Sequence, residues 1–438
     1  MPPFSCHRFV NPLSSLRRHF EIAVASKCPP ALGSEILEMT ANPASPETAV
    51  PPPMPVREER VHALDNLRAV AMLLGIVLHA ALSFMTLPIP WIARDVGRSL
   101  GFDIMVGVIH GFRMQLFFFI AGFFGHLLWQ RLGAKDFLRQ RWKRIGVPFL
   151  LGMVTLVPLI IVVWGWSEMR ATTRPTRPQY GNLTIFSIPT GHLWFLEMLL
   201  LLYGGAALTA WAGLTLKLTS WLPRLDAAFD WFIGSFWKPL LLVPPTVLCL
   251  WGGPMLGEID AAGLRLLPAA RAVGYYGLFF LVGWWLHRRR HQLGALRGWL
   301  KTYFALAAVA FLMLGACHLA QAKPADANFV SIKLLALIAA SLYAWTMTFA
   351  VTGWFMRFAG QHSARVRYLA DASYWCYLLH LPLVLWLQVV VANWVLNGWF
   401  KFAFIMAVNV VLLLVSYHWC VRYTWIGRLL NGPRERAS

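Results

Sequence analysis

Residues 64–87 read LDNLRAVAMLLGIVLHAALSFMTL, an apolar run with only a few polar residues near its start. An α-helix of about 20 apolar residues spans the hydrocarbon core of a bilayer. Further spans are predicted at 105–129, 145–166, 192–213, 232–253, 271–287, 302–320, 331–353, 372–395 and 402–421. Only 13% of the 438 residues are charged, whereas soluble domains carry about 25%. The sequence therefore predicts an all-α polytopic integral membrane protein, a bundle of about ten transmembrane helices.

The first part of the chain differs in composition from the rest. Residues 1–56 are rich in Pro, Ser and Ala, without a long apolar run or the apolar core of a secretory signal. This composition predicts disorder. Translation from Met54 is an alternative start, so no function is assigned to what precedes it. A membrane domain is predicted over 57–425, followed by a cytoplasmic tail at 426–438.

The formal net charge is +20, which in a soluble protein would suggest nucleic-acid binding. Here the basic residues lie in short alternate connections between apolar runs, as the positive-inside rule describes. They are Arg131, Lys135, Arg139, Arg141, Lys143, Arg144, Arg288, Arg289, Arg290, Arg357, Arg365, Arg367, Arg422, Arg428, Arg434 and Arg436. We therefore predict that these connections and both termini face the cytoplasm and that no nucleic acid binds. Arg170, Arg174 and Arg177, on the opposite side, depart from the pattern.

Six cysteines are scattered through the sequence, and none forms a CxxC pair. Their spacing fits neither a disulfide framework nor a zinc site. We expect buried, inert thiols and no bound metal.

Ionisable residues inside apolar runs are costly and often functional. Arg68 and His79 lie in the first run, about 16 Å apart along a helix and within about 20° of the same face. Asp65, one turn before Arg68, is placed to pair with it.

These residues form a stripe along one face of the helix. The stripe suits a coenzyme A thioester, which carries anionic phosphates at one end and a reactive carbonyl at the other. Arg68 would hold the phosphates and His79 would act at the carbonyl. An imidazole, with an ordinary pKa of about 6.5, is an effective general base near pH 7. The structural alternative is that Asp65 and Arg68 anchor the helix end while His79 bonds a neighbouring helix.

Arg113 lies inside the second run. Its guanidinium is permanently charged and requires an anionic partner in an apolar setting. Two partners fit, namely the carboxylate of Glu197 in the fourth run or a carboxylate of the substrate. We favour Glu197.

Five more residues are candidates by position. Arg141 and Arg144, one turn apart before the third run, suit phosphates, although a positive-inside cluster needs no ligand. His192 begins the fourth run on the side away from the cytoplasm and would orient an acceptor sugar. Trp194 would stack on that sugar or anchor the interface. His380, in the ninth run, is a second imidazole deep in the membrane, for which a structural role is the simpler interpretation.

These segments together resemble the acyltransferase 3 family of membrane acyltransferases. The resemblance rests on the spacing of Arg68 and His79, Arg141-x-x-Arg144, FRMQ at 112–115 with FFFIAG at 117–122, HLWFL at 192–196 and YLLHLP at 377–382. It extends from about residue 57 to 425.

The resemblance implies transfer of an acyl group, succinyl or acetyl, from cytoplasmic acyl-CoA to a hydroxyl of a periplasmic glucan or other polysaccharide. The setting is the bacterial inner membrane, with acyl-CoA as a co-substrate and no resident cofactor. It implies that His79 is catalytic, that Arg68 assists, and that Arg141 and Arg144 bind the donor with Arg68. Candidate substrate- or acyl-binding residues are Arg113, His192, Trp194, Glu197 and His380.

Two other classes of function remain. A proton-coupled transporter of a sugar or an organic acid would also use buried His, Arg and Glu residues. Against it, the sequence shows no repeated halves, and the distance from Arg68 to His79 matches a thioester arm. The third possibility is a structural scaffold of a glucan-export complex, in which His79 would be dispensable.

Overall fold

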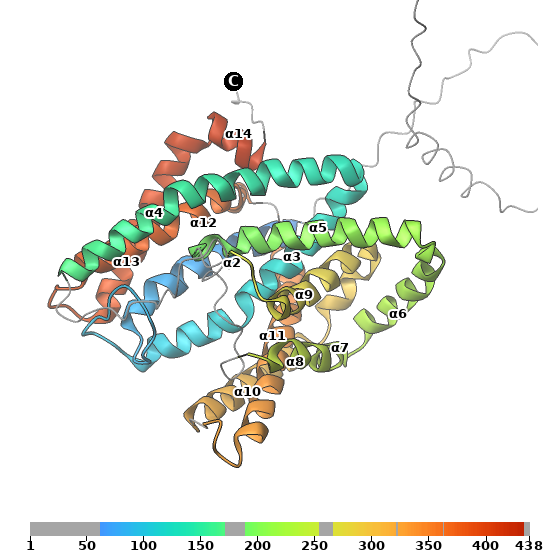
Figure 1. The fold of residues 1–438 in the computed structure, drawn as a ribbon, viewed down its shortest axis with the longest axis horizontal. Helices are drawn as coiled ribbons and strands as arrows, with labels where there is room; N and C mark the ends of the chain where they lie inside the picture. The colour runs from blue at the N-terminus through green and yellow to red at the C-terminus, as the bar shows by residue number, and fades with distance from the viewer. Residues whose placement is uncertain (1–61, 171–188, 254–265, 321–322, 362, 433–438) are drawn as a thin grey trace, which may run out of the picture. The chain divides into compact units, whose positions relative to one another are not determined.

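The computed structural model describes residues 62–170, 189–253, 266–320, 323–361 and 363–432. Within these ranges the chain forms helices and no strands, which confirms the all-α prediction (Figure 1). The long helices are α2 His62–Ala81, α3 Leu100–Arg141, α4 Val147–Arg170, α5 Trp194–Thr215, α6 Leu222–Gly234, α9 Ala270–Arg288, α10 Leu300–Leu319, α11 Phe329–Phe358, α12 Ala364–Val391 and α13 Gly398–Ser416. The shorter ones are α7 Lys238–Leu241, α8 Val243–Trp251 and α14 Trp425–Asn431. The segment 1–56, predicted to be disordered, lies outside the described residues, as do Arg174 and Arg177.

Seven helical stretches among the described residues are long and apolar enough to cross a membrane. They are His62–Phe84, Leu100–Met169, Gly191–Thr215, Leu300–Leu319, Phe329–Phe358, Ala364–Val391 and Gly398–Val421. The predicted count of about ten is therefore not confirmed. One stretch, Leu100–Met169, contains both the second and the third predicted spans. The sixth predicted span corresponds to α9, which is not among the seven.

The prediction of one continuous helix at 232–253 is wrong. The structure divides this region among the end of α6, α7 and α8. Pro239 lies at the start of α7, and Pro244 lies at the start of α8. Proline is tolerated in the first turn of a helix but interrupts a helix that reaches it from the N-terminal side.

The predicted loop between the second and third spans is also helical. α3 continues through it, with Gly133 (φ 72°, ψ 172°) as a non-helical kink. The five-residue π-turn η2, Trp142–Gly146, then leads directly into α4. Glycine adopts a positive φ without steric cost, so Gly133 lets the chain change direction between the two helical parts of α3 that precede and follow it.

Helices α3 and α9 cross in direct backbone contact. Gly122 of α3 lies against the main chain of Phe280, and Gly283 of α9 lies against the main chain of Phe119. Small residues at a crossing let two helices in a membrane approach closely. This contact fixes α3, which carries Arg113, against the rest of the bundle.

Gly283→Ala should therefore destabilise the protein, because a Cβ there would overlap the Phe119 main chain, which cannot yield without moving α3. Overpacking of this kind costs about 1–3 kcal/mol. Gly277→Ala on the same helix is the matched control, since its Cβ would meet only a Leu202 side-chain carbon at 3.5 Å. Thermal melting of the detergent-purified proteins measures the difference. Equal melting temperatures for the two variants would contradict the importance of the crossing.

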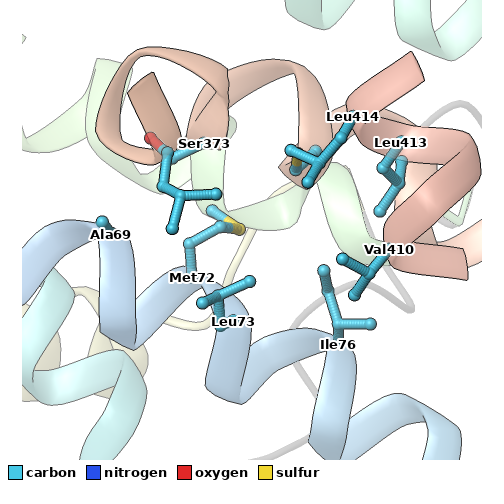
Figure 2. Close-up of a pocket in the computed structure, with 10 residues that line it drawn as sticks. Ala69, Met72, Leu73, Ile76, Ser373, Val410, Leu413 and Leu414 are labelled. Atoms are coloured by element: carbon cyan, nitrogen blue, oxygen red, sulfur yellow. The ribbon is translucent and has the colours of Figure 1, made fainter. Parts of the chain in front are cut away.

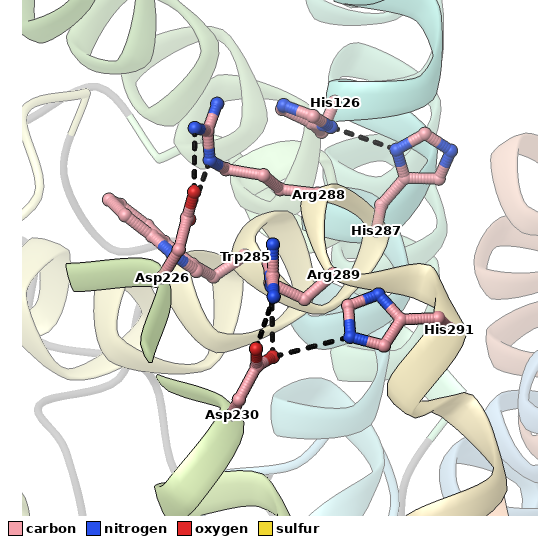
Figure 3. A network of polar contacts seen from close by, with 8 residues as sticks. All are labelled: His126, Asp226, Asp230, Trp285, His287, Arg288, Arg289 and His291. Carbon is pink, nitrogen blue, oxygen red and sulfur yellow. Dashed lines mark hydrogen bonds and ion pairs between the residues drawn. The ribbon is translucent and has the colours of Figure 1, made fainter. Parts of the chain in front are cut away.

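The residues at the end of α9 form ion pairs with α6 (Figure 3). Arg288 donates to both carboxylate oxygens of Asp226 at 2.7 and 2.8 Å. Arg289 pairs with Asp230, and hydrogen bonding from Arg289 lowers the pKa of the Asp230 carboxyl. This pair therefore stays ionised at neutral pH.

In the same turn, α9 is joined to α3 by two buried histidines (Figure 3). The Nδ1 atoms of His126 and His287 are 2.8 Å apart. One ring must donate and the other accept, because two protonated nitrogens cannot share this contact.

The basic connections meet at one end of the bundle. Asn66, near the start of α2, donates to the Ala359 carbonyl after α11 at 2.7 Å. Tyr374 of α12 donates to the Arg144 carbonyl at 2.7 Å, and Asn431 of α14 donates to a main-chain carbonyl of α12 at 2.8 Å. We call this the basic end. Its position at the cytoplasmic face stays a prediction.

Candidate functional site

Three histidines that are far apart in the sequence lie together at the opposite end of α2. His79 lies two residues before the end of α2, His192 in the short helix η4 (Gly191–Leu193), and His380 within α12. The ring of His380 is 5.2 Å from that of His79 and 5.6 Å from that of His192, between centroids. The structure thus brings together three residues that the sequence proposed separately.

Each of these rings has a buried nitrogen without a hydrogen-bond partner among the described residues: Nδ1 of His79, Nδ1 of His192 and Nε2 of His380. The other nitrogen of His192 is 2.9 Å from the Leu378 carbonyl, and that of His380 is 2.7 Å from the Tyr377 carbonyl. A carbonyl can only accept, so these nitrogens carry the proton. In the neutral rings, the free nitrogens of His192 and His380 are therefore hydrogen-bond acceptors.

Arg113 of α3 reaches into the same region. Its guanidinium lies over Gly75, one turn before His79 on α2, and a Cβ at Gly75 would collide with it. The charge of Arg113 acts on both His79 and His380. Glycine at position 75 thus makes the space that holds a cation beside the histidines.

The predicted ion pair between Arg113 and Glu197 is wrong. Glu197 is buried in α5, but Arg113 forms no ion pair with any carboxylate of the described residues. The physical reason is the gap at Gly75, which lets the guanidinium extend to α2 instead of α5. A permanent charge without a carboxylate partner in the described part of the chain is suited to a substrate anion.

Sequence patterns missed two residues that surround His79. Trp91 stacks on the His79 ring, with centroids 5.9 Å apart and planes at 11°. Gln388 accepts from the Trp91 indole at 2.9 Å and donates to the carbonyls of His79 and Ala80 at 2.9 and 3.1 Å. The last carbonyls of a helix lack partners within it, so Gln388 caps α2 from another helix. No signal in the sequence relates residues so far apart.

The predicted donor residues lie at the basic end. Arg68 pairs with Asp65 at 3.6 Å, as predicted. The Arg141 guanidinium lies 5.4 Å from the centre of the Tyr203 ring. Arg68 and Arg141 both interact electrostatically with the Tyr203 hydroxyl. Arg144 follows in η2, where the charge of Arg141 acts on it. The structure therefore brings the three arginines to one region.

A small polar recess opens beside Arg68, between the starts of α2 and α12. Its lining includes two arginines and two aspartates, and consists of His62, Asp65, Asn66, Arg68, Ser363, Arg367, Ala370 and Asp371. Arg367 is a further cation here that the sequence did not single out as a site residue.

Aromatic rings on α12 connect the basic end with the histidines. The Tyr374 and Tyr377 rings are 6.4 Å apart, and the Tyr377 and His380 rings are 6.3 Å apart. Tyr377 also donates to the His192 carbonyl at 2.6 Å. This stripe runs beside the stripe of α2 that joins Arg68 to His79, because α2 and α12 pack together.

An apolar crevice lies on the α13 side of these two helices (Figure 2). It extends along the part of α2 that separates Arg68 from His79. Its lining residues are Ala69, Met72, Leu73, Ile76, Leu369, Ser373, Cys376, Val410, Leu413 and Leu414.

Trp194 packs within the bundle, with its ring 6.1 Å from Phe118 and 5.3 Å from Tyr276. Its predicted stacking on a sugar stays a prediction. Across the described ranges, no group of three or more His, Cys, Asp or Glu side chains is arranged to hold a metal ion.

Comparisons with known proteins agree on one family. A family model described as "Acyltransferase domain" matches residues 61–418. Glucans biosynthesis protein C from Escherichia coli strain K12 is 26% identical over 385 residues, covering 83% of this chain and 93% of the relative. The protein of that name from Escherichia coli O81 strain ED1a is 25% identical over 377 residues, with the same coverage. No solved structure matches significantly.

Proposed function

Because the chain belongs to the family that this acyltransferase domain defines, we propose that it transfers a succinyl or acetyl group from cytoplasmic acyl-CoA to a periplasmic glucan or another polysaccharide. The family and the apolar helices make it a multi-pass membrane acyltransferase. Its place is the bacterial inner membrane, with both termini in the cytoplasm. The observation that carries the proposal is the arrangement along α2: three arginines from different elements lie near its start, and three histidines lie beside Arg113 near its end.

The reaction is an ester-forming transfer. His79 takes the proton of an acceptor hydroxyl while that oxygen attacks the thioester carbonyl carbon. The carbon–sulfur bond breaks, and the leaving thiolate receives the proton from His79 and departs as free CoA. The free nitrogens of His192 and His380 accept hydrogen bonds from other hydroxyls of the acceptor.

Arg113 binds the free carboxylate of a succinyl group. Its guanidinium forms no ion pair with a described carboxylate, and guanidinium and carboxylate match in a bidentate geometry. An acetyl group has no such carboxylate. Succinyl is therefore the acyl group that the site favours.

The decisive experiment supplies labelled succinyl-CoA and a glucan to the purified protein in vesicles. We expect free CoA and labelled ester in equal amounts. A transporter would move its substrate without releasing CoA, and a scaffold would do neither. Mass spectrometry of periplasmic glucans from cells with and without the gene then identifies the acyl group and the acceptor.

Arg144→Ala should raise the KM for acyl-CoA roughly tenfold or more, because a charge-assisted contact to a phosphate contributes about 1.5–3 kcal/mol. Initial rates at varied donor concentration measure this. Arg139→Ala is the matched control, since Arg139 carries the same charge near the same end but is exposed on α3. An unchanged donor KM for Arg144→Ala would remove this residue from the donor site.

A further inference from the structure

The segment between α2 and α3, residues 82–99, is held rigidly over the end of α2. The Asp103 carboxylate accepts from the main-chain nitrogens of Thr86 and Leu87 at 2.9 and 3.0 Å. Further along, Asp95 pairs with Lys401 of α13 at 2.8 Å, and these side chains are only 3% and 0% exposed. Breaking a buried pair leaves an uncompensated charge, so this segment is fixed at both ends.

Trp91 lies between these two anchors, and contacts with His79 and Gln388 fix the position of its side chain. Its ring stacks on His79, and its indole N–H is held by Gln388, which is 1% exposed. Gln388 in turn binds the carbonyl of His79. Trp91, Gln388 and His79 therefore form one closed set of contacts, while Trp91 itself is partly exposed.

The residues after Trp91 enter a small second core. Ile92 and Ala93 pack there with side chains of α4 and α12, and Trp91 and Trp164 lie at its edge. The Trp164 indole nitrogen is buried and has no hydrogen-bond partner among the described residues. An unpaired buried donor costs free energy, which a hydroxyl group of a bound ligand would offset.

We propose that Trp91 is the acceptor-positioning residue: the part of its indole that the His79 ring leaves uncovered packs on a sugar ring of the acceptor beside His79. This inference rests on the proposed function. A pyranose presents an apolar C–H face that packs on an aromatic ring and a rim of hydroxyls that accept hydrogen bonds. Trp91 supplies the aromatic face beside the general base, and Trp164 supplies a donor near by.

The location separates this role from donor binding. Trp91 lies at the end of α2 opposite Arg68, and these two ends of the stripe are about 16 Å apart. The phosphates of the donor belong at the basic end, so they do not reach Trp91. A change at Trp91 should consequently affect the acceptor alone.

Acyl transfer with varied glucan and varied succinyl-CoA tests the proposal. Trp91→Ala should raise the acceptor KM about three- to tenfold, the size expected for loss of one aromatic stack, with the donor KM unchanged. Trp91→Phe keeps an aromatic face and should recover part of the affinity. Trp386→Ala is the control, because Trp386 is a tryptophan of α12 that is 43% exposed.

Glucan binding without donor, measured by titration calorimetry, gives a second readout and should weaken by the same factor. An unchanged acceptor KM in both Trp91 variants would overturn the inference, and so would an equal rise in donor KM. If Trp91→Ala does not fold, Trp91→Phe decides the matter by the ratio of the two KM values. Failure of the wild-type protein to release CoA would instead refute the proposed function, whatever the Trp91 variants bind.

Discussion

His79→Gln should lower the rate of acyl transfer about 10²–10⁴-fold, the contribution of a general base, while the protein remains folded. Glutamine preserves the hydrogen-bonding capacity and approximate size of the side chain but has no nitrogen that accepts a proton near pH 7. A structural role for His79 would therefore be rescued by glutamine, whereas a catalytic role would not. The measurement is the rate of CoA release at saturating donor and acceptor, together with the melting temperature.

His318→Gln is the control for this substitution. His318 is exposed on α10, and its ring lies 2.9 Å from the Leu314 carbonyl of the same helix, so its variant should transfer at the normal rate. Full turnover in a folded His79→Gln protein would exclude His79 as the base and make His380 the next residue to test. Label retained on the protein when the acceptor is withheld would indicate a covalent acyl-histidine route in place of direct attack.

Arg113→Met should reduce kcat/KM for succinyl-CoA about 10- to 150-fold, since hydrogen bonds to a charged group contribute about 1.5–3 kcal/mol. Acetyl-CoA, which lacks the second carboxylate, should be affected little. The melting temperature should not fall. The substitution removes a charge that has no carboxylate partner among the described residues. Replacing such a charge with an apolar side chain is often neutral or stabilising. Loss of activity with succinyl-CoA but not with acetyl-CoA, without loss of stability, identifies a charge that binds the substrate carboxylate.

Arg113→Lys provides the internal comparison. Lysine keeps the positive charge but lacks the planar, two-pronged donor, so it should fall between the wild type and Arg113→Met with succinyl-CoA. Equal losses with both donors would contradict carboxylate binding and indicate that Arg113 stabilises the oxyanion of the reaction. No loss with either donor would remove Arg113 from the site.

The local features of this protein could be read from its sequence. Apolar length and helical periodicity are properties of a continuous segment. The first helix was therefore predicted at 64–87 and is observed as the stretch His62–Phe84, and the pair of Asp65 with Arg68 was also predicted. The predicted count of about ten spans depended on the same signal and was not confirmed. Hydropathy alone does not show that Pro239 and Pro244 divide a span or that η2 joins two spans into one stretch.

The partners of the site residues were decided only by the tertiary structure. Arg113 meets α2 instead of Glu197 because a glycine at position 75 leaves space for it. His79 contacts His380, Trp91 and Gln388, the last of them 309 residues away. Such contacts depend on how each helix is rotated and where it crosses its neighbours. Packing between helices fixes both quantities, and the pattern along any single helix contains neither.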